Sequence, residues 1–155
     1  DYIVICTNTM HKVAPQIQSR ISIPLIHIAD ATADALENAG VKTVALLGTK
    51  YTMTQDFYKN KLTDRGIRVI VPDEPDIETV NRVIYDELCR GIISPDSRHA
   101  YTEIIGKLKA NGARGVILGC TEIGLLIHQE DSPLPVFDTT VIHARKAALL
   151  SVRCP

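Results

Sequence analysis

Two short segments, far apart in the chain, place side chains that can move protons at the end of a β-branched run. Residues 3–9 read Ile-Val-Ile-Cys-Thr-Asn-Thr, and residues 116–122 read Val-Ile-Leu-Gly-Cys-Thr-Glu. Each is followed by an apolar stretch that contains a proline, at 23–27 and 134–138, and then by an alanine-rich helical pattern. This repeat predicts a duplicated unit whose two copies each bring one reactive tip to a shared site. Such an arrangement suits proton transfer at both faces of one small molecule.

Cys120 is the first candidate for chemistry. An unperturbed thiol titrates at about 8.5, and the dipole of a helix N-terminus lowers that pKa because it favours the thiolate. Cys120 stands between a strand and a helix start, so we expect its thiol to be activated in this way. The alternative is a small buried side chain at a strand end, which is a common role of cysteine.

Thr7, Asn8 and Thr9 are the second candidates. Hydroxyl, carboxamide and backbone N–H groups at a turn from strand to helix form a nest that binds anions. Helix capping by Asn8 or Thr9 would explain a single such residue, and the two roles are compatible. Thr121 and Glu122 offer the same two roles in the second copy.

A third tip, Gly-Thr-Lys-Tyr-Thr at 48–52, also follows a buried run and precedes a helical pattern. It has neither the spacing of a Walker A loop nor a G-x-G-x-x-G pattern, so the sequence disfavours nucleotide binding. A carboxylate suits so small a nest better. Lys50 either adds positive charge to the nest or is simply solvated.

Strand-like and helix-like segments alternate along the chain. Runs of Val, Ile and Leu without polar alternation predict strands covered on both faces, at 2–6, 24–28, 43–47, 68–71, 115–118 and 134–137. Helical patterns lie at 13–19, 31–38, 53–63, 77–90, 95–111 and 142–150. Gly40, Gly66 and Gly112 mark helix ends, and Asp76 and Ser94 mark helix starts. The order predicts an α/β fold with mainly parallel sheets, in which ligands bind at the carboxyl ends of the strands.

Composition and charge narrow the class of protein. The 155 residues suffice for one well-buried domain or for two small lobes. With 17 basic and 18 acidic residues and no basic stripe, the chain is not expected to bind nucleic acid. No apolar run reaches the roughly 20 residues of a membrane helix, and no signal peptide is found, so we expect no membrane partner.

The cysteines and histidines predict no metal site. Four cysteines, at 6, 89, 120 and 154, lack metal-binding spacing and indicate reduced thiols of a cytoplasmic protein. Cys89 and Cys154 are interpreted as structural or incidental, whereas Cys6 is harder to assign because it adjoins Thr7. The histidines at 11, 27, 99, 128 and 143 are scattered and are interpreted as satisfied polar residues, with His11 and His143 as the candidates for exceptions.

The segments Cys-Thr-Asn-Thr-Met-His-Lys at 6–12 and Gly-Cys-Thr-Glu-Ile at 119–123 resemble the two signature motifs of the aspartate/glutamate racemases. The similarity continues through 24–30, 45–49 and 135–139 and is strongest to the bacterial branch that acts on L-aspartate and L-glutamate. The resemblance implies two pseudo-symmetric α/β lobes with the substrate between them. It also implies racemisation without pyridoxal phosphate or metal, and a part of the first lobe that precedes residue 1.

The same resemblance assigns proton transfer at Cα to Thr7 and Cys120, one from each copy. The family generally has cysteine at both positions, so this chain departs at the first. Alignment on Asn8-Thr9 selects Thr7, and alignment on Cys-Thr selects Cys6. We prefer Thr7 because Asn-Thr directly follows the base in the family, and because a shift of one residue along a strand would turn Cys6 to the opposite face. A hydroxyl is far less acidic than a thiol, so Thr7 should mainly donate and Cys120 should mainly accept a proton.

The resulting hypothesis is a racemase of aspartate and glutamate without a cofactor. Residues 1–23 and 136–155 form an incomplete first lobe, residues 24–135 form the second lobe, and the site lies between them. Backbone N–H groups of the tips hold the α-carboxylate, and six side chains bind the substrate or shape the site: Asn8, Thr9, Thr49, Thr52, Thr121 and Glu122. An exposed sheet edge makes a homodimer an option. Two alternatives stay open: a one-cysteine relative that resembles arylmalonate decarboxylase or hydantoin racemase, and a dicarboxylate-binding protein without catalysis.

Overall fold

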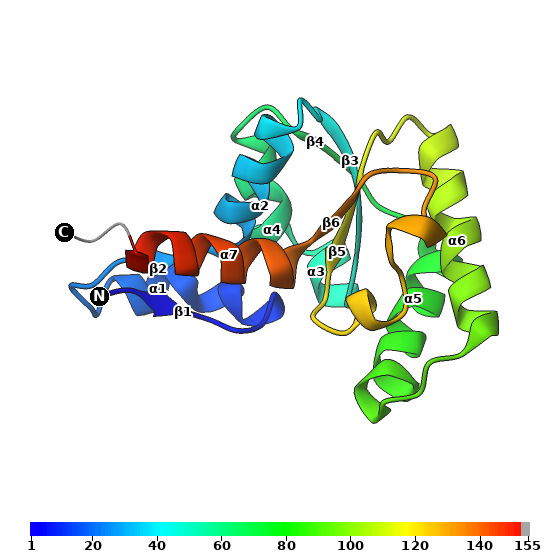
Figure 1. Cartoon of the computed structure of the whole chain (residues 1–155), viewed down its shortest axis with the longest axis horizontal. Coiled ribbons are helices and arrows are strands. Elements are labelled where there is room, and N and C mark those ends of the chain that lie inside the picture. Colours follow the sequence, from blue (N-terminus) through cyan, green and yellow to red (C-terminus); the bar gives the residue numbers. More distant parts are fainter. Residues whose placement is uncertain (153–155) are drawn as a thin grey trace.

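The computed structural model describes residues 1–152, and within them the strands form two parallel sheets (Figure 1). In the smaller sheet β1 (Ile3–Val4) pairs with β2 (Leu25–Ile26). The larger sheet has the order β4 (Arg68–Ile70), β3 (Thr43–Gly48), β5 (Val116–Gly119) and β6 (Val136–Asp138). All six predicted strands are present, and the α/β class with parallel sheets is confirmed.

Helices connect the strands wherever the sequence predicts them. The described elements, in chain order, are η1 (Thr9–Val13), α1 (Ala14–Gln18), α2 (Ile28–Asn38), α3 (Lys50–Thr54), α4 (Asp56–Thr63), α5 (Glu74–Asp86), η2 (Leu88–Arg90), α6 (Pro95–Ala110), η3 (Ile123–Leu125), η4 (Gln129–Asp131) and α7 (Thr139–Val152). Gly40, Gly66 and Gly112 follow α2, α4 and α6 with positive φ, as predicted for helix ends.

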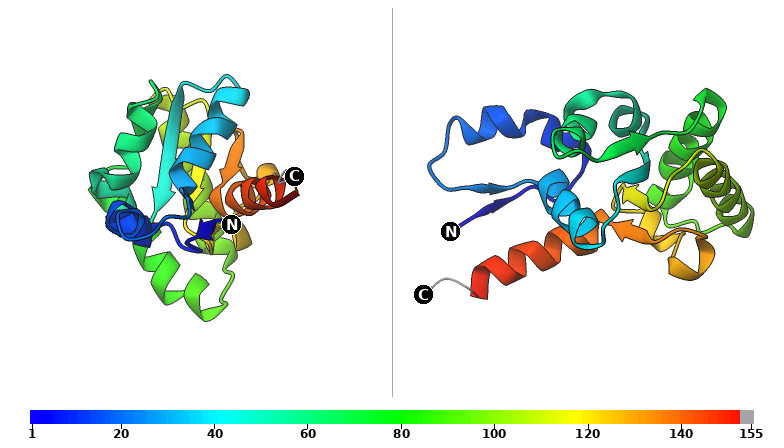
Figure 2. Two further views of the ribbon diagram at one scale, coloured as in Figure 1. Left: turned by 90° about the vertical axis from the view of Figure 1, so that its left-hand side faces the viewer. Right: turned by 90° about the horizontal axis from the view of Figure 1, so that it is seen from above.

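Alternate residues of β3 build the cores on the two faces of the larger sheet. Ala45 and Leu47 join a cluster with the apolar side chains of α5 and α6, whereas Val44 and Leu46 join another with those of α2 and α4. These four side chains are fully buried, and burying a leucine contributes about 1.5–3 kcal/mol. The views in Figure 1 and Figure 2 show the helices as a layer on each side of this sheet. The two cores hold the carboxyl ends of β3 and β5 in place.

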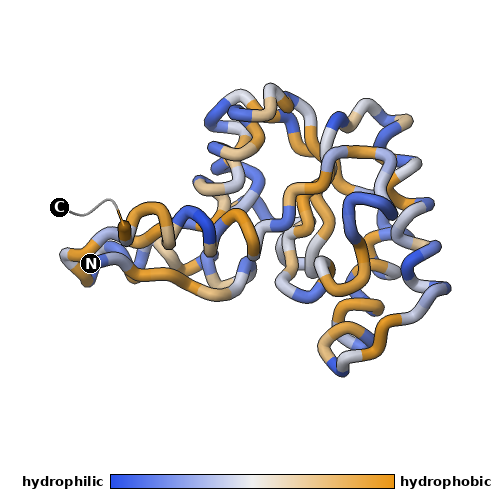
Figure 3. Tube along the Cα trace, viewed as in Figure 1, coloured by the Kyte–Doolittle hydropathy of each residue, from blue (hydrophilic) through white to orange (hydrophobic). Residues whose placement is uncertain are grey.

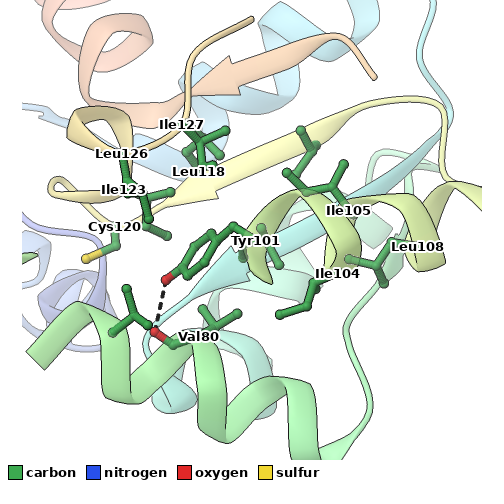
Figure 4. Packing of buried hydrophobic residues seen from close by; sticks show 14 of the residues in the cluster. Val80, Tyr101, Ile104, Ile105, Leu108, Leu118, Cys120, Ile123, Leu126 and Ile127 are labelled. Carbon is green, nitrogen blue, oxygen red and sulfur yellow. Dashed lines mark hydrogen bonds between the residues drawn. The ribbon is translucent and has the colours of Figure 1, made fainter. Parts of the chain in front are cut away.

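Tyr101 ties α6 to α5 inside the first of these cores. Its ring is fully buried, and its hydroxyl donates a hydrogen bond of 3.0 Å to the backbone oxygen of Val80 (Figure 4). Cys120 belongs to the same cluster and lies at its margin in that view. The apolar core therefore fixes the surroundings of the candidate thiol.

Several helix boundaries differ from the sequence prediction, and local contacts explain three of the differences. Asp73, rather than Asp76, caps α5: its carboxylate accepts from the N–H of Asp76, which lies in the first turn. The helix α2 begins at Ile28 because the His27 ring accepts from the N–H of Ala29. The predicted helix at 53–63 is two helices, since Gln55 has an extended backbone. Ser94 does cap α6, as predicted.

The division into two lobes stays a prediction, and the strand pairing bears on its edges. Leu25–Ile26 pairs with β1 and so belongs with the first sheet, whereas Val136–Asp138 pairs with β5 in the second. The helix α7 runs beside the small sheet, where His143 Nε2 lies 2.7 Å from Ile26 O (Figure 2). This end of the molecule carries many apolar residues, drawn orange in Figure 3, and some of them, such as Val4 and Leu149, are exposed.

Among residues 1–152 we find no helix with the length and apolar character to cross a membrane.

Candidate active site

The three tips meet at one place, as the sequence predicts. Thr9 Oγ1 lies 3.2 Å from Thr49 Oγ1 and 3.4 Å from Thr52 Oγ1, which joins the first tip to the third. The third tip adjoins the second because Gly48 and Gly119 face each other in register at the ends of β3 and β5. Glycine is needed at this contact: a Cβ on Gly48 would stand 2.9 Å from the Gly119 carbonyl oxygen.

A cavity of about 420 Å³ opens where the tips meet. Most of the predicted site residues line it, namely Thr7, Asn8, Thr9, Thr49, Cys120, Thr121 and Glu122. Thr52 lies behind this lining: it is fully buried and its hydroxyl is 3.2 Å from that of Thr49. We therefore assign Thr52 the role of shaping the site.

The sequence did not indicate the opposite wall of the cavity. Ile84 and Tyr85 of α5 and Cys89 of η2 line it. Met10 and Tyr51, which follow the first and third tips, line the cavity as well. These α5 and η2 residues follow an ordinary amphipathic pattern, so only the packing of α5 against the sheet shows that they face the cavity. Cys89, interpreted from the sequence as structural, is an exposed thiol of this wall. Cys154 lies outside the described residues.

The Cys120 thiol is held in its protonated form. It is 8% exposed and donates a hydrogen bond of 2.9 Å to Glu122 Oε2. Burial and this carboxylate together raise the pKa of Cys120 to about 12. The expectation that a helix dipole lowers the pKa of Cys120 is wrong. Only the three-residue 3₁₀ turn η3 follows Cys120, and desolvation disfavours the thiolate.

The Glu122 carboxylate is the hydrogen-bond acceptor at the centre of the second tip. Besides the thiol, it accepts a hydrogen bond of 2.7 Å from the Thr121 hydroxyl. Burial acts to raise the pKa of Glu122, but the two hydrogen bonds outweigh it, so this pKa lies below its ordinary value. The carboxylate is therefore ionised beside a protonated thiol.

Thr7 and Cys6 both line the cavity, so strand alternation does not separate them. The strand β1 ends at Val4, and the chain bends at Cys6. The expectation that Cys6 is turned to an opposite face is therefore wrong. Thr7 differs in being partly buried and in having its carbonyl oxygen 2.8 Å from the Nδ1 of the buried His11, whereas Cys6 is exposed. The preference for Thr7 stays a prediction.

Asn8 is 3% exposed and uses only part of its amide. Its Nδ2 donates a hydrogen bond of 3.0 Å to Oγ1 of Thr139, which is the first residue of α7. Its Oδ1 is buried and has no partner among the described residues. A buried acceptor without a donor costs about 1–3 kcal/mol, so the fold holds this amide in place at an energetic cost.

Comparison with known proteins adds the family. The model of the Asp/Glu/hydantoin racemase family matches residues 1–147. The chain belongs to this family. The resemblance seen in its motifs is thereby confirmed.

Solved structures and a curated relative agree with this assignment. The chain is 55% identical to a Yersinia pestis protein assigned as an Asp/Glu racemase, with a TM-score of 0.93 over 98% of this chain and 66% of that one. It is 38% identical to an aspartate racemase homologue from Pyrococcus horikoshii OT3, with a TM-score of 0.89 over 98% and 67% of the two chains. The broad specificity amino-acid racemase RacX of Bacillus subtilis is 25% identical over 94% of this chain and 62% of its own length. The chain thus spans about two thirds of these relatives.

In this family member three histidines support the first tip. His11 Nε2 accepts from the N–H of Ile28 at 3.1 Å, so its Nδ1 carries the proton and donates to Thr7 O. The rings of His27 and His143 lie 4.5 Å and 5.6 Å from that of His11. Burial lowers the pKa of His11, and burial together with His11 lowers the pKa of His27 to about 4. The described residues contain no His/Cys/Asp/Glu group able to hold a metal, and the histidines act as satisfied polar groups.

Lys50 does not add charge to the nest. Its ammonium pairs with Glu74 at 3.0 Å and also with Glu78, both on α5. These two carboxylates raise its pKa to about 12. Its backbone N–H donates to Asn81, which anchors the start of α3.

Proposed function

We propose that the protein racemises amino acids by proton transfer at Cα between Cys120 and Thr7, with aspartate and glutamate as substrates and without a cofactor. One observation carries the proposal: Cys120 and Thr7, from the ends of strands in two different sheets, line the same cavity. Family membership and the racemase relatives support this class of reaction. We place the cavity between the two lobes.

The thiol needs a proton acceptor before it can act as a base, because burial and Glu122 keep it protonated. Glu122 Oε2, at 2.9 Å, is positioned to receive that proton. The S–H bond then breaks towards the carboxylate, and the thiolate removes the α-proton. The electron pair stays at Cα and the α-carboxylate, and the Thr7 hydroxyl relays a proton to the opposite face, giving up its own proton as it takes one from solvent. Cys120 is left as a thiol that carries the substrate's proton, and Glu122 releases its proton to solvent. General acid–base steps of this kind contribute about 10²–10⁴-fold in rate.

The polar groups of the tips suit the common part of an amino acid. We assign the α-ammonium to Asn8, which lines the cavity and whose Oδ1 has no donor among the described residues. The hydroxyls of Thr9 and Thr49 and the backbone N–H groups of the tips suit the α-carboxylate and the charge that develops on it. The Thr121 hydroxyl donates its proton to Glu122 and so shapes the site instead. We assign the side-chain carboxylate to the Tyr51 and Tyr85 hydroxyls, since both residues line the cavity.

The proposal is tested by α-proton exchange in deuterated water. The full-length protein is incubated with L-aspartate or L-glutamate, and the loss of the α-proton signal is followed by NMR, beside the Cys120→Ala variant. We expect exchange in the parent protein and its loss in the variant. Binding of aspartate by calorimetry without exchange would support a dicarboxylate-binding protein instead. Decarboxylation of an arylmalonate would support a one-cysteine decarboxylase.

The proposal also covers the cofactor, the cellular location and the oligomeric state. The chain's own thiol and hydroxyl carry the proton transfer, so added pyridoxal phosphate should leave the exchange rate unchanged. The cytoplasmic location and the homodimer stay predictions. Cys6, Cys89 and Cys120 are free thiols, as the sequence predicts.

A further inference from the structure

The Thr139 hydroxyl links the two tips that carry Thr7 and Cys120. Thr139 is fully buried at the start of α7. Its hydroxyl donates to Leu118 O at 2.8 Å and accepts from Asn8 Nδ2 at 3.0 Å. Asn8 is the neighbour of Thr7, and Leu118 precedes Cys120 by two residues, so one hydroxyl connects both reacting segments.

The direction of these two bonds fixes the orientation of the Asn8 amide. A carbonyl oxygen only accepts, so the contact with Leu118 O uses the single proton of the Thr139 hydroxyl. Thr139 Oγ1 can then only accept from Asn8, and the atom that faces it is the Nδ2 donor. The Asn8 Oδ1 acceptor is thereby turned away from Thr139 and left without a partner.

We propose that Thr139 is a positioning residue of the reaction: its hydroxyl fixes the orientation of the Asn8 amide beside Thr7 and sets the separation of the Thr7 and Cys120 tips. This inference rests on the proposed function. Misplacing reacting groups by about 1 Å can cost about 10²-fold in rate, so a tie between the tips bears directly on catalysis.

Helix capping does not explain this hydroxyl. The N-terminus of α7 is capped by Asp138, whose Oδ1 accepts from the N–H groups of Thr140 at 2.8 Å and Val141 at 3.2 Å. The Thr139 hydroxyl instead forms its two hydrogen bonds with other elements, namely with Leu118 of β5 and with Asn8 of the first tip.

A matched pair of substitutions separates positioning from stability. Thr139→Val keeps the shape and removes the hydroxyl, and Thr139→Ser keeps the hydroxyl. The control is Thr32→Val, because Thr32 is equally buried, donates to Ile28 O at 2.8 Å and accepts from Tyr58 Oη at 3.2 Å. Thr32 lies outside the cavity lining, so its variant should lose a similar amount of stability and keep its kinetics.

We expect Thr139→Val to lower kcat/KM for α-proton exchange about 10- to 100-fold, with Thr139→Ser retaining most of the rate and Thr32→Val unchanged. A double-mutant cycle with Asn8→Ala follows: if Thr139 acts through Asn8, Thr139→Val should have little further effect in that background. Equal rate losses in Thr139→Val and Thr32→Val, or a full further loss in the Asn8→Ala background, would overturn the inference.

A measurement without substrate keeps the inference separate from the proposed function. In the full-length protein, the side-chain amide protons of Asn8 should exchange slowly with solvent in the parent and in Thr139→Ser, and faster in Thr139→Val. A parent protein without α-proton exchange would refute the proposed function, and the proposed catalytic role of Thr139 with it. Equally fast amide exchange in the parent and in Thr139→Val would refute the tie itself.

Discussion

The Cys120 thiol donates to the Glu122 carboxylate across 2.9 Å, in a place where burial alone already disfavours a thiolate. The sulfur therefore keeps its proton at rest, and the carboxylate beside it is the group that can take it. The reactivity of this tip therefore depends on Cys120 and Glu122 together. We infer that Glu122 accepts the thiol proton in addition to binding or shaping the site.

Replacing Glu122 by glutamine separates thiol acidity from activity. The carboxylate is one of the causes that raise the Cys120 pKa, so Glu122→Gln should bring that pKa down from about 12. The exchange rate should nevertheless fall by about 10²-fold or more, because the proton acceptor is lost. Thiolate absorbance against pH gives the first quantity and α-proton exchange the second. A variant with a lower thiol pKa and faster exchange would show that Glu122 is no proton acceptor.

Replacing Thr7 by cysteine tests which residue faces the other side of the substrate. A thiol is a better base than a hydroxyl, so Thr7→Cys should speed deuterium wash-in from D-aspartate while changing that from L-aspartate less. The matched control is Cys6→Ser, because Cys6 lines the same cavity. We expect Cys6→Ser to leave both rates close to those of the parent. No gain with D-aspartate in Thr7→Cys, or a large loss in Cys6→Ser, would move the role to Cys6.

Most of the scaffold follows from the sequence because its determinants are local. β3 and β5 are unbroken apolar runs buried on both faces, so their position and parallel class could be predicted. The convergence of Thr9, Thr49 and Cys120 then follows from the rule that ligands bind at the carboxyl ends of parallel strands.

Features that depend on packing could not be predicted in this way. The pKa of Cys120 is set by its burial and by Glu122, so the dipole expectation, which considered only the neighbouring chain, had the wrong direction. Tyr85 and Cys89 reach the cavity only because α5 and η2 pack beside it. Thr139 lies in the segment 135–139 that resembles the family, but the resemblance assigns it no role, and its proposed role depends on a contact with Asn8, 131 residues away in sequence.

The glycine contact between β3 and β5 should be sensitive to one added methyl group. In Gly48→Ala the new Cβ would stand 2.9 Å from Gly119 O and 3.2 Å from Thr52 Cβ, with backbone on one side. We expect a loss of about 1–3 kcal/mol in the free energy of unfolding and slower exchange. In the control Gly106→Ala, nothing lies within 4 Å of the new Cβ on α6, so a gain of about 0.5–1 kcal/mol is expected. Denaturant titration measures both, and an unchanged Gly48→Ala would refute the close contact.

Acid should destabilise the first tip through His27. In the folded protein its pKa is lowered from 6.5 to about 4, chiefly by burial and by His11. Between these values the unfolded chain binds more protons than the folded one, so stability should be complete above about pH 6.5 and decline as the pH falls towards 4. Of the neighbouring charges, Lys61 and His143 lower this pKa further, and Asp30 opposes the lowering without outweighing it.

The variant His27→Asn tests this origin of the acid sensitivity. Asparagine is also a good N-cap for α2, as its side-chain oxygen can accept from the N–H of Ala29 in place of the His27 ring, but it does not titrate. The unfolding free energy of the variant, measured by urea titration from pH 7 to pH 4, should therefore fall less steeply than that of the parent. His99→Asn is the control, because His99 is an exposed residue of α6 that pairs with Glu103. Equal slopes for His27→Asn and the parent would place the acid sensitivity elsewhere in the fold.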